Sequence, residues 1–259
     1  MSKASTVRLF HPHEISALER SELDSRGHLV LPGLLTLEAR EALIAALKRI
    51  AALHAASERE RPGDQTPRRY AAEFDAFLAS LIAHPDLLAL ARSILGADIR
   101  YDHCVVLNRM GADPGMRWHT HEYADSDPSL GFLRIFFYVN GFGADDGGLK
   151  VVPGSHLFRD SRVTADTDAD LQRTWLDGKR HPWTGKPLDI ERLSAPEGSV
   201  VLMWTHALHG VTPRKPLSSM RWMVVYAYRN PGQPSRARWI TEEFEHSPVP
   251  GTEGLMSLY

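Results

Sequence analysis

The feature that most constrains the fold of this chain is a change of sequence pattern after Gly96. Beyond that glycine the sequence breaks into short runs rich in β-branched and aromatic residues, among them IRYDHCVVLNRM, LRIFFYVNGF, SVVLMWTHALHGV and MRWMVVYAYRN. Clusters of Gly, Pro and Asp separate the runs, as turns separate the strands of an antiparallel barrel or sandwich. We therefore expect residues 97–230 to form an antiparallel β core.

Ahead of Gly96 the patterning is helical. The stretch TLEAREALIAALKRIAALHAA opens with Thr36, a good helix cap, and repeats its leucines at helical intervals. A second helical region is predicted from about Tyr70 to Leu95, with an interruption at His84, because a residue that precedes proline is displaced from the helical conformation. We expect these helices, within residues 15–96, to buttress one sheet of the core.

The composition of the chain limits the classes of protein to which it can belong. The 259 residues are 43% hydrophobic and 24% charged, as in an ordinary globular chain, and we expect residues 1–259 to form a single domain. The 30 basic and 32 acidic residues give no sign of a nucleic-acid partner.

A single cysteine, Cys104, lies in an apolar run and is read as a buried, inert thiol. We see neither a signal peptide nor a membrane-spanning run, and expect a cytoplasmic protein.

Two segments lie outside the regular patterns. Residues 157–196 are polar and long for a loop, and are read as an insertion within the core that acts as a lid over the substrate. The tail at residues 231–259 reads as extended and weakly ordered.

The stretch RWHTHEYADSD contains two histidines at i and i+2, His119 and His121. In a strand both side chains project from one face and can reach one metal ion, whereas on a helix they point about 200° apart. The stretch follows the turn GADPG and precedes the run LRIFFYV, which favours the strand. Two further histidines, His206 and His209, lie near the end of another apolar run, and Arg221 follows His209 by twelve positions.

With this layout the sequence resembles the phytanoyl-CoA dioxygenase (PhyH-like) family of Fe(II)- and 2-oxoglutarate-dependent oxygenases. The resemblance covers roughly residues 15–230 and rests on Trp118-His119, GGLKVVPGSH at 147–156, His209-Gly210 and Arg221. It implies a mainly β fold with flanking helices, the double-stranded β-helix (jelly roll, cupin-like). It also implies Fe(II), 2-oxoglutarate as cosubstrate, O2 and a small-molecule substrate, with hydroxylation as the default outcome.

The resemblance assigns the metal ligands, with one departure. The family pattern is His-x-Asp or His-x-Glu followed by a distant His. On this sequence His119 is the first ligand and His209 the last, but His121 occupies the carboxylate position. Either His121 is the third ligand, or a neighbouring carboxylate takes its place (Glu122 above all, or Asp125 or Asp127), or no functional iron binds.

The resemblance also implies that Arg221 clamps the distal carboxylate of 2-oxoglutarate, although Arg221 could instead pair with a surface carboxylate. Asn108 and Arg109 either contact cosubstrate or substrate or form a solvated polar edge. His206 is read as structural and His156 as a turn residue in the pocket wall. Two rival functions stay open at this point: a three-histidine metal dioxygenase that does not use 2-oxoglutarate, and a non-catalytic jelly-roll binding protein.

Overall fold

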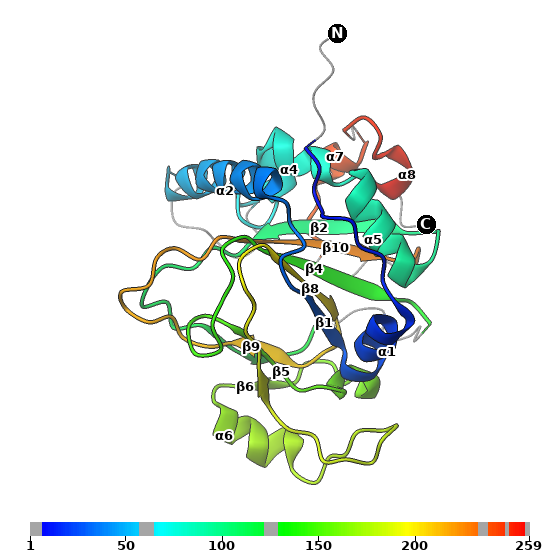
Figure 1. The fold of residues 1–259 in the computed structure, drawn as a ribbon, viewed down its shortest axis with the longest axis vertical. Helices are drawn as coiled ribbons and strands as arrows, with labels where there is room; N and C mark the ends of the chain where they lie inside the picture. The colour runs from blue at the N-terminus through cyan, green and yellow to red at the C-terminus, as the bar shows by residue number, and fades with distance from the viewer. Residues whose placement is uncertain (1–6, 57–64, 122–128, 233–237, 247–248, 257–259) are drawn as a thin grey trace.

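The computed structural model describes residues 7–56, 65–121, 129–232, 238–246 and 249–256. Within them the chain forms two facing antiparallel sheets flanked by helices, and the predicted jelly roll is confirmed (Figure 1). We call the first the major sheet; its strands in spatial order are β1 (His28–Leu31), β8 (Ser199–Trp204), β4 (Phe132–Tyr138), β10 (Met223–Arg229) and β2 (Arg100–Val106). We call the second the minor sheet; its order is β6 (Thr164–Ala165), β3 (Met116–His119), β9 (His209–Val211), β5 (Leu149–Val151) and β7 (Glu191–Arg192).

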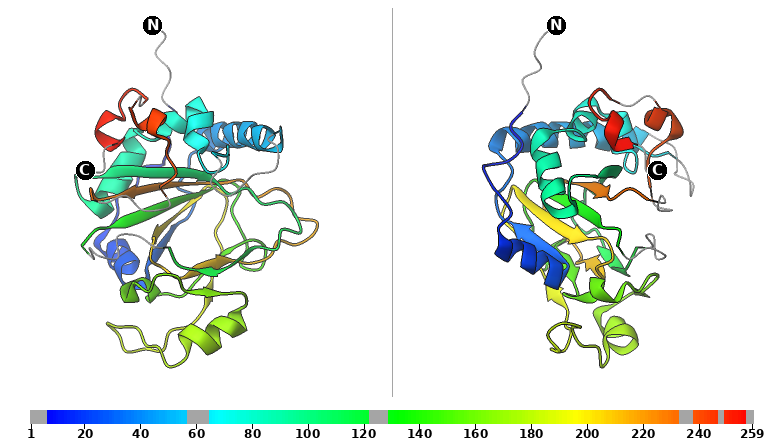
Figure 2. Two further views of the ribbon diagram at one scale, coloured as in Figure 1. Left: turned by 180° about the vertical axis from the view of Figure 1, so that it is seen from behind. Right: turned by 90° about the vertical axis from the view of Figure 1, so that its right-hand side faces the viewer.

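Helices cover the outer face of the major sheet (Figures 1 and 2). They are α1 (Ala17–Arg26), α2 (Leu37–Ala56), α3 (Ala71–Phe74), α4 (Ala76–Leu81) and α5 (Pro85–Leu95). The predicted helix after Thr36 and the break at His84 are both confirmed. A second break falls at Asp75, whose carboxylate accepts the backbone N–H groups of Phe77 and Leu78 and so caps a new helix. The predicted buttress also contains an element we did not expect, the edge strand β1.

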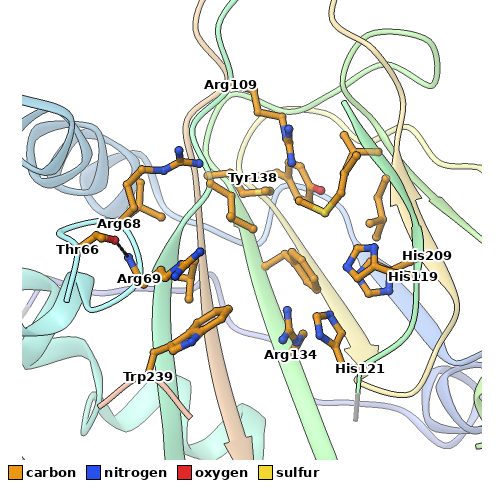
Figure 3. Close-up of a pocket in the computed structure, with 18 residues that line it drawn as sticks. Thr66, Arg68, Arg69, Arg109, His119, His121, Arg134, Tyr138, His209 and Trp239 are labelled. Carbon is orange, nitrogen blue, oxygen red and sulfur yellow. Dashed lines mark hydrogen bonds between the residues drawn. The ribbon is translucent and has the colours of Figure 1, made fainter. Parts of the chain in front are cut away.

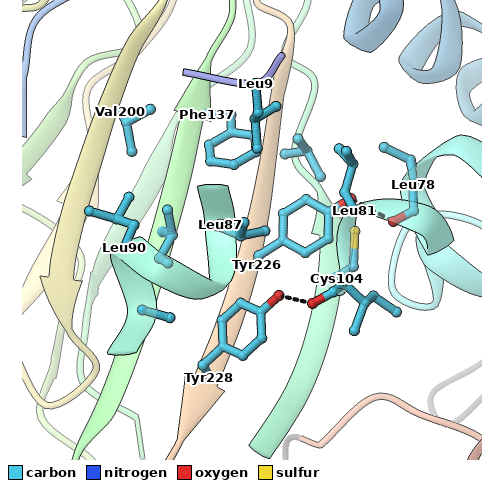
Figure 4. Packing of buried hydrophobic residues seen from close by; sticks show 14 of the residues in the cluster. Leu9, Leu78, Leu81, Leu87, Leu90, Cys104, Phe137, Val200, Tyr226 and Tyr228 are labelled. Carbon is cyan, nitrogen blue, oxygen red and sulfur yellow. Dashed lines mark hydrogen bonds between the residues drawn. The ribbon is translucent and has the colours of Figure 1, made fainter. Parts of the chain in front are cut away.

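The main hydrophobic core lies between these helices and the major sheet (Figure 4). Tyr226 and Tyr228 project from β10 into it and donate their hydroxyls to the carbonyls of Leu78 and Ile82, over 2.8 and 2.6 Å. Cys104 is fully buried in the same core, and burial raises the pKa of its thiol to about 12, as expected of an inert cysteine. This packing fixes the outer face of the major sheet and leaves its inner face for the site.

The run SVVLMWTHALHGV is not one strand, as the sequence suggested, but two. Strand β8 ends at Trp204 in the major sheet, and the chain crosses to the minor sheet before β9 begins at His209. A turn with a hydrogen bond from the Ala207 N–H to the Trp204 carbonyl makes the crossing. The crossing carries His209 onto the sheet that also carries His119.

The insertion at residues 157–196 has more regular structure than a loop. Its strands β6 and β7 form the two edges of the minor sheet, and between them lie α6 (Asp168–Leu171) and the π-helix η2 (Gln172–Leu176). The 3₁₀-helix η1 (Ser155–Phe158) leads into it. Leu171 and Leu176 pack in an apolar cluster with Trp118 of β3. The insertion is therefore built into the minor sheet.

The prediction of an extended tail was wrong for the residues described. Two short helices form, α7 (Glu242–His246) and α8 (Glu253–Met256), and Leu255 and Met256 are buried against the main core. Apolar side chains spaced too sparsely to signal a helix are sufficient here, because packing against the main core stabilises helices this short. None of the helices described is long and apolar enough to cross a membrane.

Candidate metal centre

Pairing between two strands of the minor sheet places two of the predicted ligands side by side. His119 on β3 and His209 on β9 are directly opposite residues of the antiparallel ladder, and their ring centroids are 4.3 Å apart. His121 follows β3 by two residues, with its ring 4.9 Å from that of His119 and 5.2 Å from that of His209. One ligand atom from each of the three histidines lies within 4.8 Å of the other two (Figure 3).

Hydrogen bonds set the tautomers of the two paired histidines. Nδ1 of His119 lies 3.0 Å from the carbonyl oxygen of Arg117, and Nδ1 of His209 lies 2.8 Å from that of Ala207. A carbonyl only accepts, so each Nδ1 carries the proton and each Nε2 presents a lone pair. This is the arrangement by which backbone carbonyls orient metal-binding histidines.

Burial keeps all three imidazoles neutral. It is the largest cause lowering the pKa of His119, and it holds the pKa values of His121 and His209 well below the ordinary value for histidine. The positive charge of Arg134 acts in the same direction on each. Neutral imidazole is the form that binds a metal, so the three residues fit a divalent ion such as Fe(II).

Within the part of the chain described, the three histidines are the single group of three or more potential metal ligands that converges. No Asp or Glu from those residues joins it. Glu122, Asp125 and Asp127, the carboxylates considered as substitutes for His121, lie outside the described residues. His206 lies in the turn after β8 and lines a separate cavity together with His156.

A cavity of about 320 Å³ extends from the three histidines between the two sheets (Figure 3). Its walls combine apolar side chains with arginines. The lining residues besides the histidines are Thr66, Arg68, Arg69, Val105, Val106, Leu107, Arg109, Met116, Arg134, Phe136, Tyr138, Leu149, Val211, Met223 and Trp239. The mixture is that of a small-molecule site, in which apolar walls supply contact and a few polar groups set orientation.

At or behind one side of the cavity are three buried donor atoms without a hydrogen-bond partner among the described residues. They are the hydroxyl of Tyr138 and the Nε atoms of Arg109 and Arg221. Burial raises the pKa of the Tyr138 hydroxyl, while the charges of Arg109 and Arg221 oppose this shift, which places both arginines near it. Unpartnered buried donors are costly, and they mark a place where a ligand can supply the acceptor.

The predicted clamp residue Arg221 lies behind this wall and is not one of the lining residues. Its guanidinium donates to the carbonyls of Asn140 (3.3 Å) and Asp146 (3.0 Å), and its backbone pairs with that of Arg109. Burial, followed by the nearby charge of Arg214, lowers the pKa of Arg221 to about 10. Arg221 keeps its charge at neutral pH.

Asn108 does not line the cavity either. Its amide oxygen accepts the backbone N–H of Met223 at 3.2 Å, and its amide nitrogen donates weakly to the Leu47 carbonyl at 3.5 Å. Sequence reasoning missed Arg134 and Tyr138 on β4. The sequence could have indicated them, because the alternation of faces along the strand LRIFFY puts both side chains on the same face.

Known proteins resemble this chain in sequence pattern and in fold. A family model described as phytanoyl-CoA dioxygenase (PhyH) matches residues 23–215. Among solved structures, SnoK, described as a non-heme alpha-ketoglutarate-dependent carbocyclase from nogalamycin biosynthesis, is 20% identical with a TM-score of 0.66, over 91% of each chain. HygX from Streptomyces hygroscopicus, solved with nickel and 2-oxoglutarate, is 17% identical with a TM-score of 0.62, over 86% of this chain and 89% of its own.

The epimerase SnoN, solved with Fe3+, alpha-ketoglutarate and nogalamycin RO, is 19% identical with a TM-score of 0.62, over 82% of each chain. No curated protein sequence matches the chain. At these identities the solved structures are evidence for the fold, and the family match carries the evidence for the class of reaction.

Proposed function

The chain belongs to the phytanoyl-CoA dioxygenase family, and from that premise we propose that its three converging histidines hold the iron with which it hydroxylates a small organic molecule. The enzyme is a non-haem iron, 2-oxoglutarate-dependent oxygenase, with Fe(II) as cofactor and 2-oxoglutarate as cosubstrate. When bound, these two groups supply the oxidising chemistry that attacks an unactivated carbon. The residues of the chain bind, orient and shield them.

The pairing of His119 with His209 carries the proposal. Both residues present Nε2 lone pairs from adjacent strands, and His121 completes the group with a third neutral nitrogen. Because no ligand in this set is charged, the metal keeps more of its positive charge than it would beside a carboxylate. We expect this to strengthen its attraction for the anionic end of 2-oxoglutarate.

We further propose that the distal carboxylate of 2-oxoglutarate binds at the wall formed by Tyr138 and Arg109, with Arg221 behind it. The three unpartnered donors there support this role, because a carboxylate would provide the acceptors that they lack. Arg221, the clamp expected from the sequence, contributes charge and the Nε donor. Asn108 is left out of the proposal because its amide already links two backbone groups.

A small-molecule substrate is consistent with the size of the cavity. HygX has been solved with hygromycin B and SnoN with nogalamycin RO, both small molecules. The cavity here, about 320 Å³, is at the lower end of the range for ligand sites. We propose a compact substrate, hydroxylated on the carbon that the walls hold nearest to the histidines.

Anaerobic titration tests the assignment. Fe(II) added with 2-oxoglutarate should produce a visible charge-transfer band at one iron per chain, and His209→Ala should abolish both the band and stoichiometric iron binding. His206→Ala is the matched control, because this residue lies in the preceding turn and lines a different cavity. Wild-type iron affinity in His209→Ala would remove His209 from the site, and the same loss in both variants would indicate general damage to the fold.

A further inference from the structure

The cavity has a strong imbalance of charge. Four arginines line it, Arg68, Arg69, Arg109 and Arg134, whereas no Asp or Glu does so in the part of the chain that the structure describes. Arg109 has a local counter-charge, since its guanidinium donates to Asp113 at 2.8 Å. Arg134 is buried on β4 and lies beside His121 (Figure 3). One dianionic cosubstrate at the Tyr138 wall leaves further positive charge in the cavity.

Arg68 and Arg69 carry part of that charge and lie across the cavity from the three histidines (Figure 3). Their segment is fixed to the major sheet, because the Val106 N–H donates to the Arg68 carbonyl over 2.8 Å. Both side chains are half-buried and point into the cavity (Figure 3). Neither guanidinium has a hydrogen bond or an ion pair within the described residues, although arginines elsewhere in the fold, such as Arg214, pair with carboxylates.

Trp239 adds a flat apolar surface next to these two charges. The Arg69 guanidinium carbon lies 5.8 Å from the centre of the Trp239 ring, and the ring itself lines the cavity. Val105 of β2 and Phe136 of β4 provide apolar contact. Two adjacent unpaired guanidinium groups beside an aromatic face match an anionic group joined to an apolar or planar body.

A fully solvated surface pair would be a simpler explanation for two unpaired arginines. It does not fit their position, since neighbouring cations in a pocket whose described lining residues include no carboxylate concentrate positive potential that bulk solvent screens incompletely. The fold keeps this charge where a ligand can neutralise it.

We infer that the substrate is an anion: a small molecule whose carboxylate or phosphate group is bound by Arg68 and Arg69 and whose apolar body packs on Trp239. The inference deepens the proposed function and rests on it for the reaction, but the binding site can be tested without turnover. Carboxylate and phosphate share the chemistry that the two arginines recognise, and the experiment separates them.

Binding of four size-matched probes to the full-length chain is measured by calorimetry: phenylacetate, phenyl phosphate, neutral phenylacetamide and cationic phenethylamine. The protein is loaded under argon with Fe(II) and saturating 2-oxoglutarate, so that the Tyr138 wall is occupied, and is also measured without metal. We expect at least one anion to bind at least about tenfold more tightly than the amide, with no detectable binding of the amine. The tighter anion identifies the class of the substrate group.

Arg68→Ala and Arg69→Ala should each weaken binding of the anions about tenfold and leave 2-oxoglutarate affinity unchanged. Arg180→Ala is the matched control, because this arginine is on the insertion and does not line the cavity. Trp239→Ala should weaken binding of the phenyl probes and leave the affinity for inorganic phosphate, measured as an additional ligand, unaffected. Arg68→Gln and Arg69→Gln repeat the test with little change of volume, should an alanine variant fold poorly.

Affinity for both anions no higher than that for phenylacetamide, or unchanged anion binding in the Arg68 and Arg69 variants, would overturn the inference. Failure of the proposed function would give a different experimental result. If wild-type protein bound neither Fe(II) nor 2-oxoglutarate, the assignment of the metal centre would be wrong, while anion binding by the metal-free chain would still test Arg68 and Arg69.

Discussion

Trp118 donates its indole N–H to Oδ1 of Asp168 over 2.8 Å, and this bond joins the strand that carries His119 to the insertion. Asp168 also accepts from Lys150 at 2.6 Å and from Arg192 at 2.8 Å. Burial alone would raise the pKa of Asp168, but the hydrogen bonds from Lys150, Arg192 and Trp118 outweigh it and lower the pKa to about 2. One carboxylate therefore connects three elements directly behind the metal centre.

Asp168→Ala is expected to destabilise the fold by about 3 kcal/mol, because it leaves the Lys150 ammonium and the Trp118 N–H without their acceptor in a largely buried place. Metal affinity should fall as well, since β3 loses its attachment to the insertion. Urea unfolding and Fe(II) titration measure the two effects. Asp166→Ala is the control, because Asp166 is exposed and forms only a 3.8 Å ion pair with Arg117. Equal unfolding free energies for the two variants would contradict this role for Asp168.

Substitutions at His121 test which side chain is the third ligand. If His121 binds the metal, His121→Ala should weaken Fe(II) binding, whereas His121→Asp should restore the charge of the family pattern, tighten binding and keep or raise succinate formation. If Glu122 is the ligand instead, Glu122→Ala should be the damaging change and His121→Ala nearly silent. Iron affinity and succinate yield for all three variants decide between these results. No effect from any of them would place both residues outside the metal site.

Substitutions at the proposed 2-oxoglutarate site should weaken cosubstrate binding by different amounts. Arg221→Ala should weaken 2-oxoglutarate binding by about 3 kcal/mol, because it removes one member of a buried charge-assisted pair. Tyr138→Phe, which deletes only a hydroxyl, should cost about 1 kcal/mol. Calorimetry on metal-loaded protein measures both, and Fe(II) affinity should stay near that of the wild type. Unchanged dissociation constants in both variants would mean that the distal carboxylate binds elsewhere.

Acid should weaken the fold through two histidines remote from the metal centre. Burial lowers the pKa values of His28 and His156 to about 4, from about 6.5 in the unfolded chain. Below pH 6.5 the unfolded state therefore binds protons that the folded state does not, so stability declines as the pH falls from about 6.5 towards 4. The full loss is about 3 kcal/mol for each histidine.

His156→Gln should reduce this pH dependence, because glutamine does not titrate while its amide can still donate to the Asp24 carbonyl as His156 Nε2 does at 2.9 Å. Unfolding free energies of metal-free protein at pH 7 and pH 5 provide the comparison. A variant whose stability falls as steeply as that of the wild type would show that His156 does not cause the decline.

Short sequence patterns predicted the helices that depend on neighbouring residues alone. Leucine spacing after Thr36 gave the bounds of α2 closely, and the proline after His84 located the break before α5. Helix α1 was missed although its signal is equally local: Ser16 and Glu19 form a reciprocal capping box. Its low hydrophobicity, with Leu23 as the one buried residue, hid it from a reading based on apolar periodicity.

Features that depend on distant contacts could not be predicted in the same way. The division of 199–211 between two sheets follows from which strands pair, and the run of apolar residues is continuous across it. The approach of His209 to His119 was expected from the family resemblance, and no spacing rule alone would have given it. Arg68, Arg69 and Trp239 reach the cavity from segments with no motif, and only the fold brings them together.

The minor sheet supplies His119 and His209, whereas Tyr138 and Arg134 belong to the major sheet, and Arg68 and Arg69 come from a segment fixed to it. Arg68 and Arg69 can therefore be exchanged without altering the backbone pairing between the histidine strands. A chain built in this way can acquire new substrates over evolutionary time while its oxidising centre stays constant.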